Sequence, residues 1–105
     1  MIDYISGKIT ELTPTAAVID NQGIGYIVEI SLQTYDAIVG KSEATIYIQR
    51  QVNQRDGQET DYGFATKDER DLFRNITSVS GMGASSARMI LSSLSPAELN
   101  EAILS

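Results

Sequence analysis

The spacing of apolar residues changes once along this chain of 105 residues, at about Thr66. Before that point, apolar residues occur in short runs that glycine, proline, asparagine and aspartate interrupt. After it, they recur every three to four residues. The first pattern is typical of strands and the second of helices. We therefore expect a β domain over residues 1–64 and a helical domain over residues 65–105.

Recognisable turns separate the strand-forming runs. Asp20 to Gly23 and Asp56-Gly57 predict hairpin turns, because glycine accepts the positive φ that such turns need. Gly7 predicts a bulge or tight bend in the first run. Between the third and fourth runs we expect a short helix over residues 31–40, with Ser31 as its N-cap. The five runs lie at residues 2–12, 15–19, 24–30, 45–48 and 61–64.

Five short strands with one helical insertion predict a mainly β fold with added α-helices. The barrel expected is a small closed one of the oligonucleotide/oligosaccharide-binding (OB) type. Because strand order cannot be read from one sequence, a fragment of a β-sandwich remains the alternative.

Two capping boxes mark helix starts after residue 65. Thr66 with Glu69, and Ser95 with Glu98, have the spacing that lets each side chain bond the other residue's amide. Pro96 suits the first turn of the last helix. Between them, two apolar stripes predict two packed helices. The stripes comprise Leu72, Phe73, Ile76 and Val79, and then Ala87, Ile90, Leu91 and Leu94.

Composition excludes several kinds of chemistry. The chain has no cysteine and no histidine, which removes disulfides, thiolate and imidazole catalysis and the common zinc sites. No run reaches the roughly 18 apolar residues of a membrane span, and the N-terminus lacks a signal-peptide pattern, so a cytoplasmic location is expected. The net charge of −6 means that any DNA contact has to be local.

The segment of residues 78–91 contains a glycine turn that feeds a helix. Its amides, with Ser85 and Ser86, could bind a phosphate at the helix N-terminus, and Arg88 follows one turn later. Equally, Gly81 and Gly83 could form a corner between two packed helices. The spacing alone leaves both interpretations open. It lacks the ending of a nucleotide-binding P-loop.

The remaining polar residues give no catalytic centre. Asp68, Glu69 and Asp71 are expected in the solvated first turn of a helix, and their spacing matches no known metal site. No cofactor is predicted. The tyrosines could stack bases on the barrel or could be core and subunit-contact residues. These are Tyr26, Tyr35, Tyr47 and Tyr62.

The joint order of four motifs resembles the RuvA family of Holliday-junction-binding subunits. The motifs are Gly23-Ile24-Gly25-Tyr26, Tyr62-Gly63-Phe64-Ala65, Glu69-Arg70-x-Leu72-Phe73 and Ser78-Val79-Ser80-Gly81-x-Gly83. The resemblance implies an OB-fold barrel followed by helix-hairpin-helix motifs. It also implies a non-catalytic, structure-specific binder of four-way junction DNA in recombination and repair. In the family a homotetramer works with the RuvB motor ATPase and the RuvC resolvase.

The family's DNA-binding turn carries over to one segment of this chain. The residues that the resemblance assigns to DNA binding are Ser80, Gly81, Met82, Gly83, Ala84, Ser85 and Ser86, with Arg88 beyond them. Relatives often have a proline or lysine directly after the second glycine. Here the turn keeps its amides but has no charge at that place, so we expect backbone amides to carry most of the contact.

The resemblance also implies a pin at the tip of the last hairpin. In the family this pin is acidic and faces the junction centre, where it helps strands to separate. Here Arg55 stands beside Asp56 and offsets its charge, so we expect the pin to steer DNA differently.

The family continues beyond the length of this chain. A second helix-hairpin-helix and a motor-binding domain follow there, so we interpret the chain as a fragment from which motor contact is not expected. Two other functions stay open: a single-strand-binding barrel in which tyrosines stack bases, and an assembly domain without DNA binding.

Overall fold

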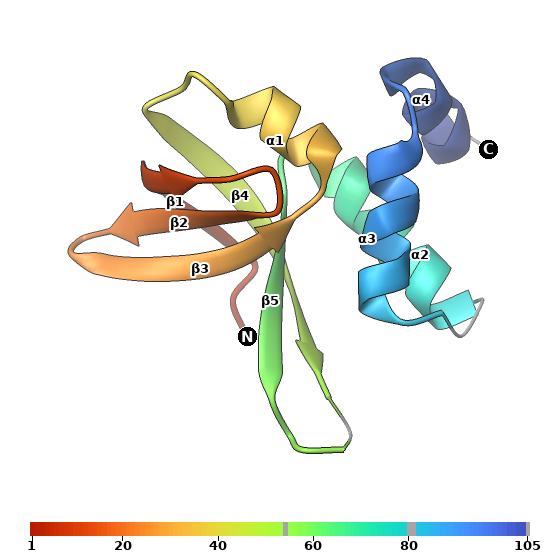
Figure 1. Cartoon of the computed structure of the whole chain (residues 1–105), viewed down its shortest axis with the longest axis horizontal. Helices are drawn as coiled ribbons and strands as arrows, with labels where there is room; N and C mark the ends of the chain where they lie inside the picture. Colours follow the sequence, from red (N-terminus) through yellow and green to blue (C-terminus); the bar gives the residue numbers. More distant parts are fainter. Residues whose placement is uncertain (54, 80–81, 105) are drawn as a thin grey trace.

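A computed structural model describes residues 1–53, 55–79 and 82–104 of the chain. Five strands close into a barrel in the order β1-β2-β3-β5-β4 (Figure 1). All neighbours are antiparallel except β3 and β5, which are parallel. The predicted barrel is therefore confirmed, and the sandwich alternative is wrong. The strands are β1 (Tyr4–Leu12), β2 (Ala16–Asn21), β3 (Ile24–Ile30), β4 (Glu43–Val52) and β5 (Glu59–Phe64).

Alternating apolar residues fill the barrel. On β2, for example, Ala17 and Ile19 point inward and are buried, as the period of two requires. The short helix α1 (Leu32–Ile38) adds Ile38 to this core, and Ser31 caps it by accepting a hydrogen bond from Thr34 N at 3.2 Å. The buried barrel core comprises Ile5, Ala17, Ile19, Val28, Ile30, Ile38, Ile46 and Ile48.

Gly7 has a different role from the predicted bulge. The pairing irregularity in β1 lies between Ile9 and Glu11, while Gly7 stays in regular register with Ala44. A Cβ atom at Gly7 would collide with the backbone carbonyl of Asp20 on β2. Glycine is needed there because two strands approach closely, which local sequence does not reveal.

Three helices follow the barrel and share a second core with it. They are α2 (Lys67–Val79), α3 (Ala84–Ser93) and α4 (Pro96–Leu104). Phe73 of α2 is fully buried, with its ring centroid 5.2 Å from that of Tyr62 and 5.0 Å from that of Phe64, both on β5. The helices are therefore packed directly on a strand of the barrel. Ala87 and Leu91 of α3 complete this core.

The apolar stripes are mostly confirmed. Leu72, Ile76 and Leu94 are half-buried against the second core, but Ile90 is 37% exposed because α3 turns that side outward. The side chain of Val79 is not among those described. No helix in the described ranges is long and apolar enough to cross a membrane.

The two capping boxes differ. At the start of α4, Ser95 Oγ accepts from Glu98 N at 3.1 Å and Glu98 Oε1 accepts from Ser95 N at 3.0 Å, as predicted. At the start of α2, Thr66 Oγ1 accepts from Glu69 N at 3.1 Å, but the Glu69 carboxylate turns away from Thr66. Its exposed fraction is 2%, so the predicted solvated position is wrong for Glu69. Asp68 and Asp71 are exposed as expected.

Candidate nucleic-acid interface

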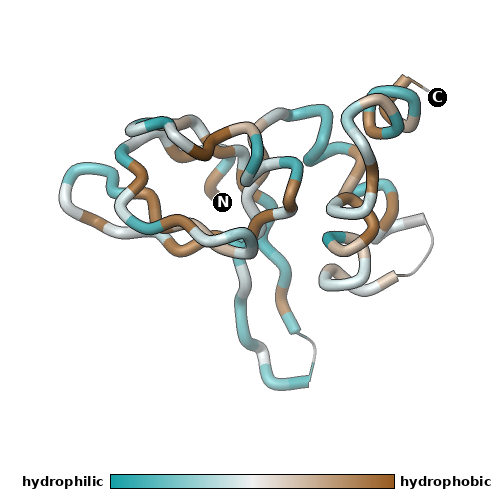
Figure 2. The backbone as a smooth tube through the Cα atoms, turned by 45° about the horizontal axis from the view of Figure 1, so that its top comes forward, coloured by the Kyte–Doolittle hydropathy of each residue, from teal (hydrophilic) through white to brown (hydrophobic). Residues whose placement is uncertain are grey.

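The β4–β5 hairpin extends well beyond the barrel and is largely hydrophilic along its arms (Figure 2). The two strands stay paired out to Val52 and Glu59. Arg50 ties the arms together, because its Nε and Nη2 donate to the Asp61 carboxylate at 2.8 and 3.1 Å. Its Nη1 also lies 3.2 Å from Glu59. The hydrogen bond and charge of Asp61, and then the charge of Glu59, raise the pKa of Arg50. The arm is therefore braced across both strands.

The tip of this hairpin carries the two predicted pin residues. Asn53 Oδ1 accepts from Arg55 N, and Asp56 Oδ1 accepts from Gln58 N, each at 2.9 Å. Gly57 has φ +70°, as the hairpin turn requires. Arg55 and Asp56 are exposed side by side, so a cation offsets the carboxylate at the tip. Gln54 lies outside the described residues.

The predicted DNA-binding turn leads into the N-terminus of α3. Gly83 is the N-cap, with φ −67° and ψ 156°, and no side chain caps this helix end. The first amides of any helix have no acceptor within the helix, so those of Ala84, Ser85 and Ser86 are donors that a ligand can use. A Cβ atom at Gly83 would meet nothing within 4 Å. Ser80 and Gly81 of the predicted turn lie outside the described residues.

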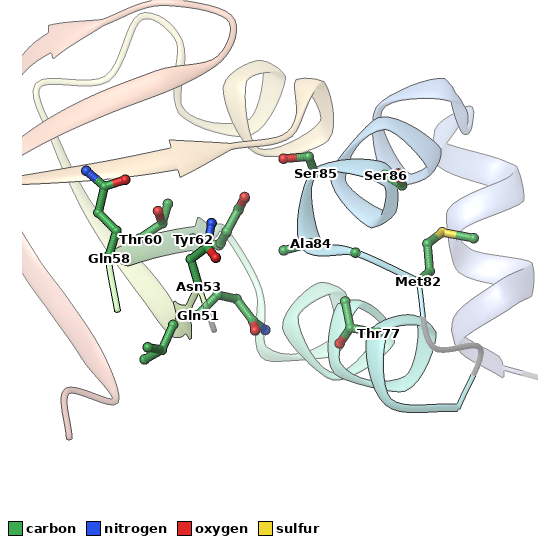
Figure 3. A pocket seen from close by; sticks show the side chains of 12 residues that line it. Gln51, Asn53, Gln58, Thr60, Tyr62, Thr77, Met82, Ala84, Ser85 and Ser86 are labelled. Carbon is green, nitrogen blue, oxygen red and sulfur yellow. The ribbon is translucent and has the colours of Figure 1, made fainter. Parts of the chain in front are cut away.

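A groove joins the hairpin to this turn. It has a volume of about 690 Å³, and hairpin residues form one wall while the start of α3 and Thr77 of α2 form the other (Figure 3). Every described residue that lines it is uncharged. The lining residues are Gln51, Val52, Asn53, Gln58, Thr60, Tyr62, Thr77, Met82, Gly83, Ala84, Ser85 and Ser86.

Most of the predicted DNA-binding turn lines this groove, but the predicted pin residues do not. Met82, Gly83, Ala84, Ser85 and Ser86 line it, whereas Arg55 and Asp56 are not among its lining residues. The hairpin wall was missed by sequence reasoning, because glutamine and threonine in a strand give no local signal of a binding surface.

Arg88 lies at the joint between α3 and the barrel. Its Nη1 is 2.9 Å from Glu29 Oε2 and donates to Thr15 O at 3.3 Å. Its guanidinium also lies 5.9 Å from the ring centroid of Tyr62. The predicted contact between Arg88 and DNA therefore competes with an ion pair to the barrel.

A buried hydrogen-bond network fixes the position of the helices on the barrel. Ser31 Oγ and Thr34 Oγ1 donate to the Glu69 carboxylate at 2.5 and 2.8 Å, and Ala65 N donates to Thr34 Oγ1 at 3.1 Å. Burial raises the pKa of Glu69, and the hydrogen bonds from Ser31 and Thr34 oppose that shift. This network links α1 and the end of β5 to α2 and so helps to hold the helices on the barrel.

Further polar contacts also hold the helices on the barrel. Arg70, 5% exposed, donates from Nη1 to Asp3 Oδ1 at 2.9 Å and to the Asp3 carbonyl at 2.8 Å. Leu32 N donates to Ser92 Oγ at 3.0 Å, and Gln33 Nε2 donates to the Leu94 carbonyl. Sequence reasoning missed the joint because its partners are 31 to 67 residues apart.

Half of the eight basic residues form ion pairs. Arg50, Arg70, Arg74 and Arg88 each pair with a carboxylate. Lys8, Lys41, Arg55 and Lys67 form no ion pair within the described part of the chain. In that part, no group of three acidic side chains is placed to hold a metal ion.

The tyrosines are mostly packing residues. Tyr62 is 6% exposed in the second core, and Tyr26 and Tyr35 pack half-buried against the barrel core. The Tyr47 ring lies 5.6 Å from the Arg70 guanidinium and 5.8 Å from Lys67 Nζ. The packing interpretation is thus the one that these four positions favour.

Comparisons with known proteins point to one family. A family model described as RuvA N terminal domain matches residues 1–61. The chain is 57% identical over 99 residues to the Holliday junction branch migration complex subunit RuvA of Bacteroides fragilis, which covers 94% of this chain and 48% of that protein. It is 50% identical over 103 residues to the same subunit of Parabacteroides distasonis, covering 98% and 52%.

A third relative is matched along the whole chain. The RuvA subunit of Christiangramia forsetii is 47% identical over 105 residues, which is 100% of this chain and 53% of that protein. The chain spans about half the length of the curated relatives it matches.

Proposed function

Because the chain belongs to the RuvA family, we propose that it binds four-way (Holliday) junction DNA as a non-catalytic subunit of a branch-migration complex. The observation that carries this proposal is the groove in which the start of α3 faces the β4–β5 hairpin. Family resemblance assigns the start of α3 to phosphate contact and the tip of this hairpin, beyond the groove, to the junction centre.

The chemistry of the α3 N-terminus supports recognition of DNA shape. Backbone amides and the hydroxyls of Ser85 and Ser86 are donors suited to phosphate oxygens. Phosphate contacts fix register and orientation but carry no base information. Binding through such contacts selects a backbone geometry, which is what distinguishes a four-way junction from linear duplex.

Electrostatics supports contacts made by neutral donors. The chain has a net charge of −6, and four of its arginines are paired with carboxylates. The residues Ser80 to Ser86 contain no charged side chain. We therefore propose that amides and hydroxyls of this segment, rather than lysines or arginines, make the principal DNA contacts, with Arg88 contributing only where its pair with Glu29 opens.

The assembly around this chain is part of the same proposal. We propose that the barrel of residues 1–64 and the helices of residues 65–105 act as two domains of a homotetramer on cytoplasmic DNA. In the family, RuvB would supply ATP-driven movement and RuvC the cleavage. The absence of cysteine and histidine supports a subunit that does no chemistry itself.

A mobility-shift comparison tests the proposal. Equal amounts of four-way junction, duplex and single-stranded DNA of matched sequence are titrated with the chain at two salt concentrations. Junction preference supports the proposal, and because neutral donors make the principal contacts, affinity should fall only shallowly with salt. Preference for the single strand, or no discrimination between junction and duplex, contradicts it.

A further inference from the structure

We propose that the groove between the β4–β5 hairpin and α3 holds one unpaired nucleotide of the bound DNA, with its base against the amide side chains of Gln51 and Gln58. The proposal rests on the function proposed above and adds a second wall to the site. That wall belongs to the arm of the hairpin rather than to its tip or to the glycine turn.

The hairpin wall offers both hydrogen-bond donors and acceptors. Gln51 and Gln58 line the groove, and within the described residues neither amide side chain has a hydrogen-bond partner. Figure 3 shows the Gln51 amide extending from the hairpin toward the side of Thr77. A carboxamide both donates and accepts, and this is the pairing chemistry of a nucleobase edge.

The opposite wall offers mainly donors. The first amides of α3 and the hydroxyls of Ser85 and Ser86 lie there, and Figure 3 shows the Ser85 hydroxyl directed toward the hairpin. Such donors suit a phosphate. A nucleotide has a phosphate at one end and a base edge at the other, so its two ends match the two walls.

Volume and charge indicate what the groove admits. The groove volume of about 690 Å³ lies within the range of small-ligand pockets. A double helix is too large to enter it. A base that enters such a space has to leave its stack, as bases do in enzymes that flip them out. Because no charged residue lines the groove in the described part of the chain, its contacts add hydrogen bonds and not counterion release.

The test compares two junctions of the same sequence, one intact and one with abasic nucleotides next to the crossover. The double variant Gln51→Ala/Gln58→Ala should bind the intact junction about 10-fold more weakly than the wild type. On the abasic junction, where no base is available, variant and wild type should bind alike. The slope of log affinity against log salt should be unchanged.

Asn100→Ala provides the matched control. Asn100 is an exposed amide side chain on α4 that does not line the groove, so this variant should bind both junctions like the wild type. Gln58 lies between the strands' paired segments, so the single variant Gln58→Ala repeats the test without altering the β4–β5 ladder.

Two results separate this inference from the proposed function. If the wild type prefers the junction to duplex but the double variant binds the intact junction equally well, the nucleotide site is wrong and junction binding stands. An equal loss on intact and abasic junctions also overturns the site. If the wild type has no junction preference, the proposed function itself fails.

Discussion

At the scale of single residues, Glu69 shows how one buried carboxylate can organise a site that it does not touch. It accepts hydrogen bonds from Ser31 and Thr34, whose own exposed fractions are 0%. Removing the carboxylate would leave two buried hydroxyls without their acceptor, which costs about 1–3 kcal/mol for each unsatisfied group. Glu69 is therefore one of the side chains that hold α2 in position on the barrel.

The ionisation of Glu69 should make stability depend on pH. Burial raises its folded-state pKa above the unfolded value of about 4.3, so the folded state holds this proton more tightly. The stabilisation is complete below the unfolded pKa and is lost as pH rises through the folded pKa. Glu69→Gln cannot ionise and removes this dependence.

Urea unfolding of both proteins between pH 4 and pH 8 measures this effect. The free energy of unfolding of the wild type should fall, relative to that of Glu69→Gln, as pH rises through that window. If the two curves run parallel, Glu69 does not titrate as described.

Gly83→Ala separates folding from DNA contact. A Cβ atom there meets nothing within 4 Å, and φ of −67° suits alanine, so the free energy of unfolding should fall by about 1 kcal/mol or less. The added methyl group lies where a phosphate would approach the α3 amides, so junction affinity should fall about 10-fold. Thermal unfolding and a binding titration on the same preparation check both. Unchanged affinity would remove Gly83 from the contact surface.

At the residue scale, interactions between residues close in the sequence could be predicted, whereas interactions between distant residues could not. Ser31, Thr66 and Ser95 were recognisable as caps because their partners lie three residues away. Glu69 was placed wrongly, and the ion pair of Arg88 could not be foreseen, because their partners Ser31 and Glu29 are brought close only by packing of helices on the barrel. For the same reason, the sequence marked Gly7 as a structurally important glycine but could not reveal the close approach of β1 and β2 that requires it.

At the scale of elements, the β4–β5 hairpin has Arg55 beside Asp56 at its tip, where the family resemblance implies an acidic pin. The pairing of its strands was predictable from alternation and from Asp56-Gly57. Its length was not, since the pairs from Gln49 to Val52 contain mostly polar residues with no core to signal them. The hairpin wall of the groove therefore emerged only from the structure.

Arg55→Glu should convert the tip to an acidic pair with Asp56. Added negative charge near phosphates raises the dissociation constant, so junction binding should weaken several-fold at low salt and less at high salt, where exposed charges are screened. Arg55→Gln is the control that removes the cation without adding an anion. Its junction affinity should lie between those of the wild type and Arg55→Glu. Equal binding by all three proteins would mean that the tip does not approach DNA.

At the scale of the whole molecule, the barrel and the helices share a core. Tyr62 and Phe64 of β5 pack with Phe73 of α2 and with Leu91 of α3, so the second core is built from both parts. The hydrogen bonds of Glu69 and Arg70 also connect the helices to the barrel. This arrangement predicts that the helices do not unfold on their own.

Phe73→Ala tests that coupling. Removing this fully buried ring should lower the free energy of unfolding by about 3–5 kcal/mol. Because the core is shared, tyrosine fluorescence from the barrel and the helical circular dichroism signal should still report one coincident transition, shifted to lower denaturant. A variant in which the helical signal is lost first, with the barrel signal unmoved, would show that the two parts are independent.

We propose that this chain recognises the shape of a four-way junction through the α3 N-terminus and the adjoining hairpin. A competition titration measures it most directly. The chain is bound to labelled junction and challenged with unlabelled junction or with duplex carrying the same arm sequences. We predict that the junction competes at least about 10-fold better than an equal mass of duplex, consistent with backbone contacts that fix position without reading bases. Equal competition by the duplex would contradict the account.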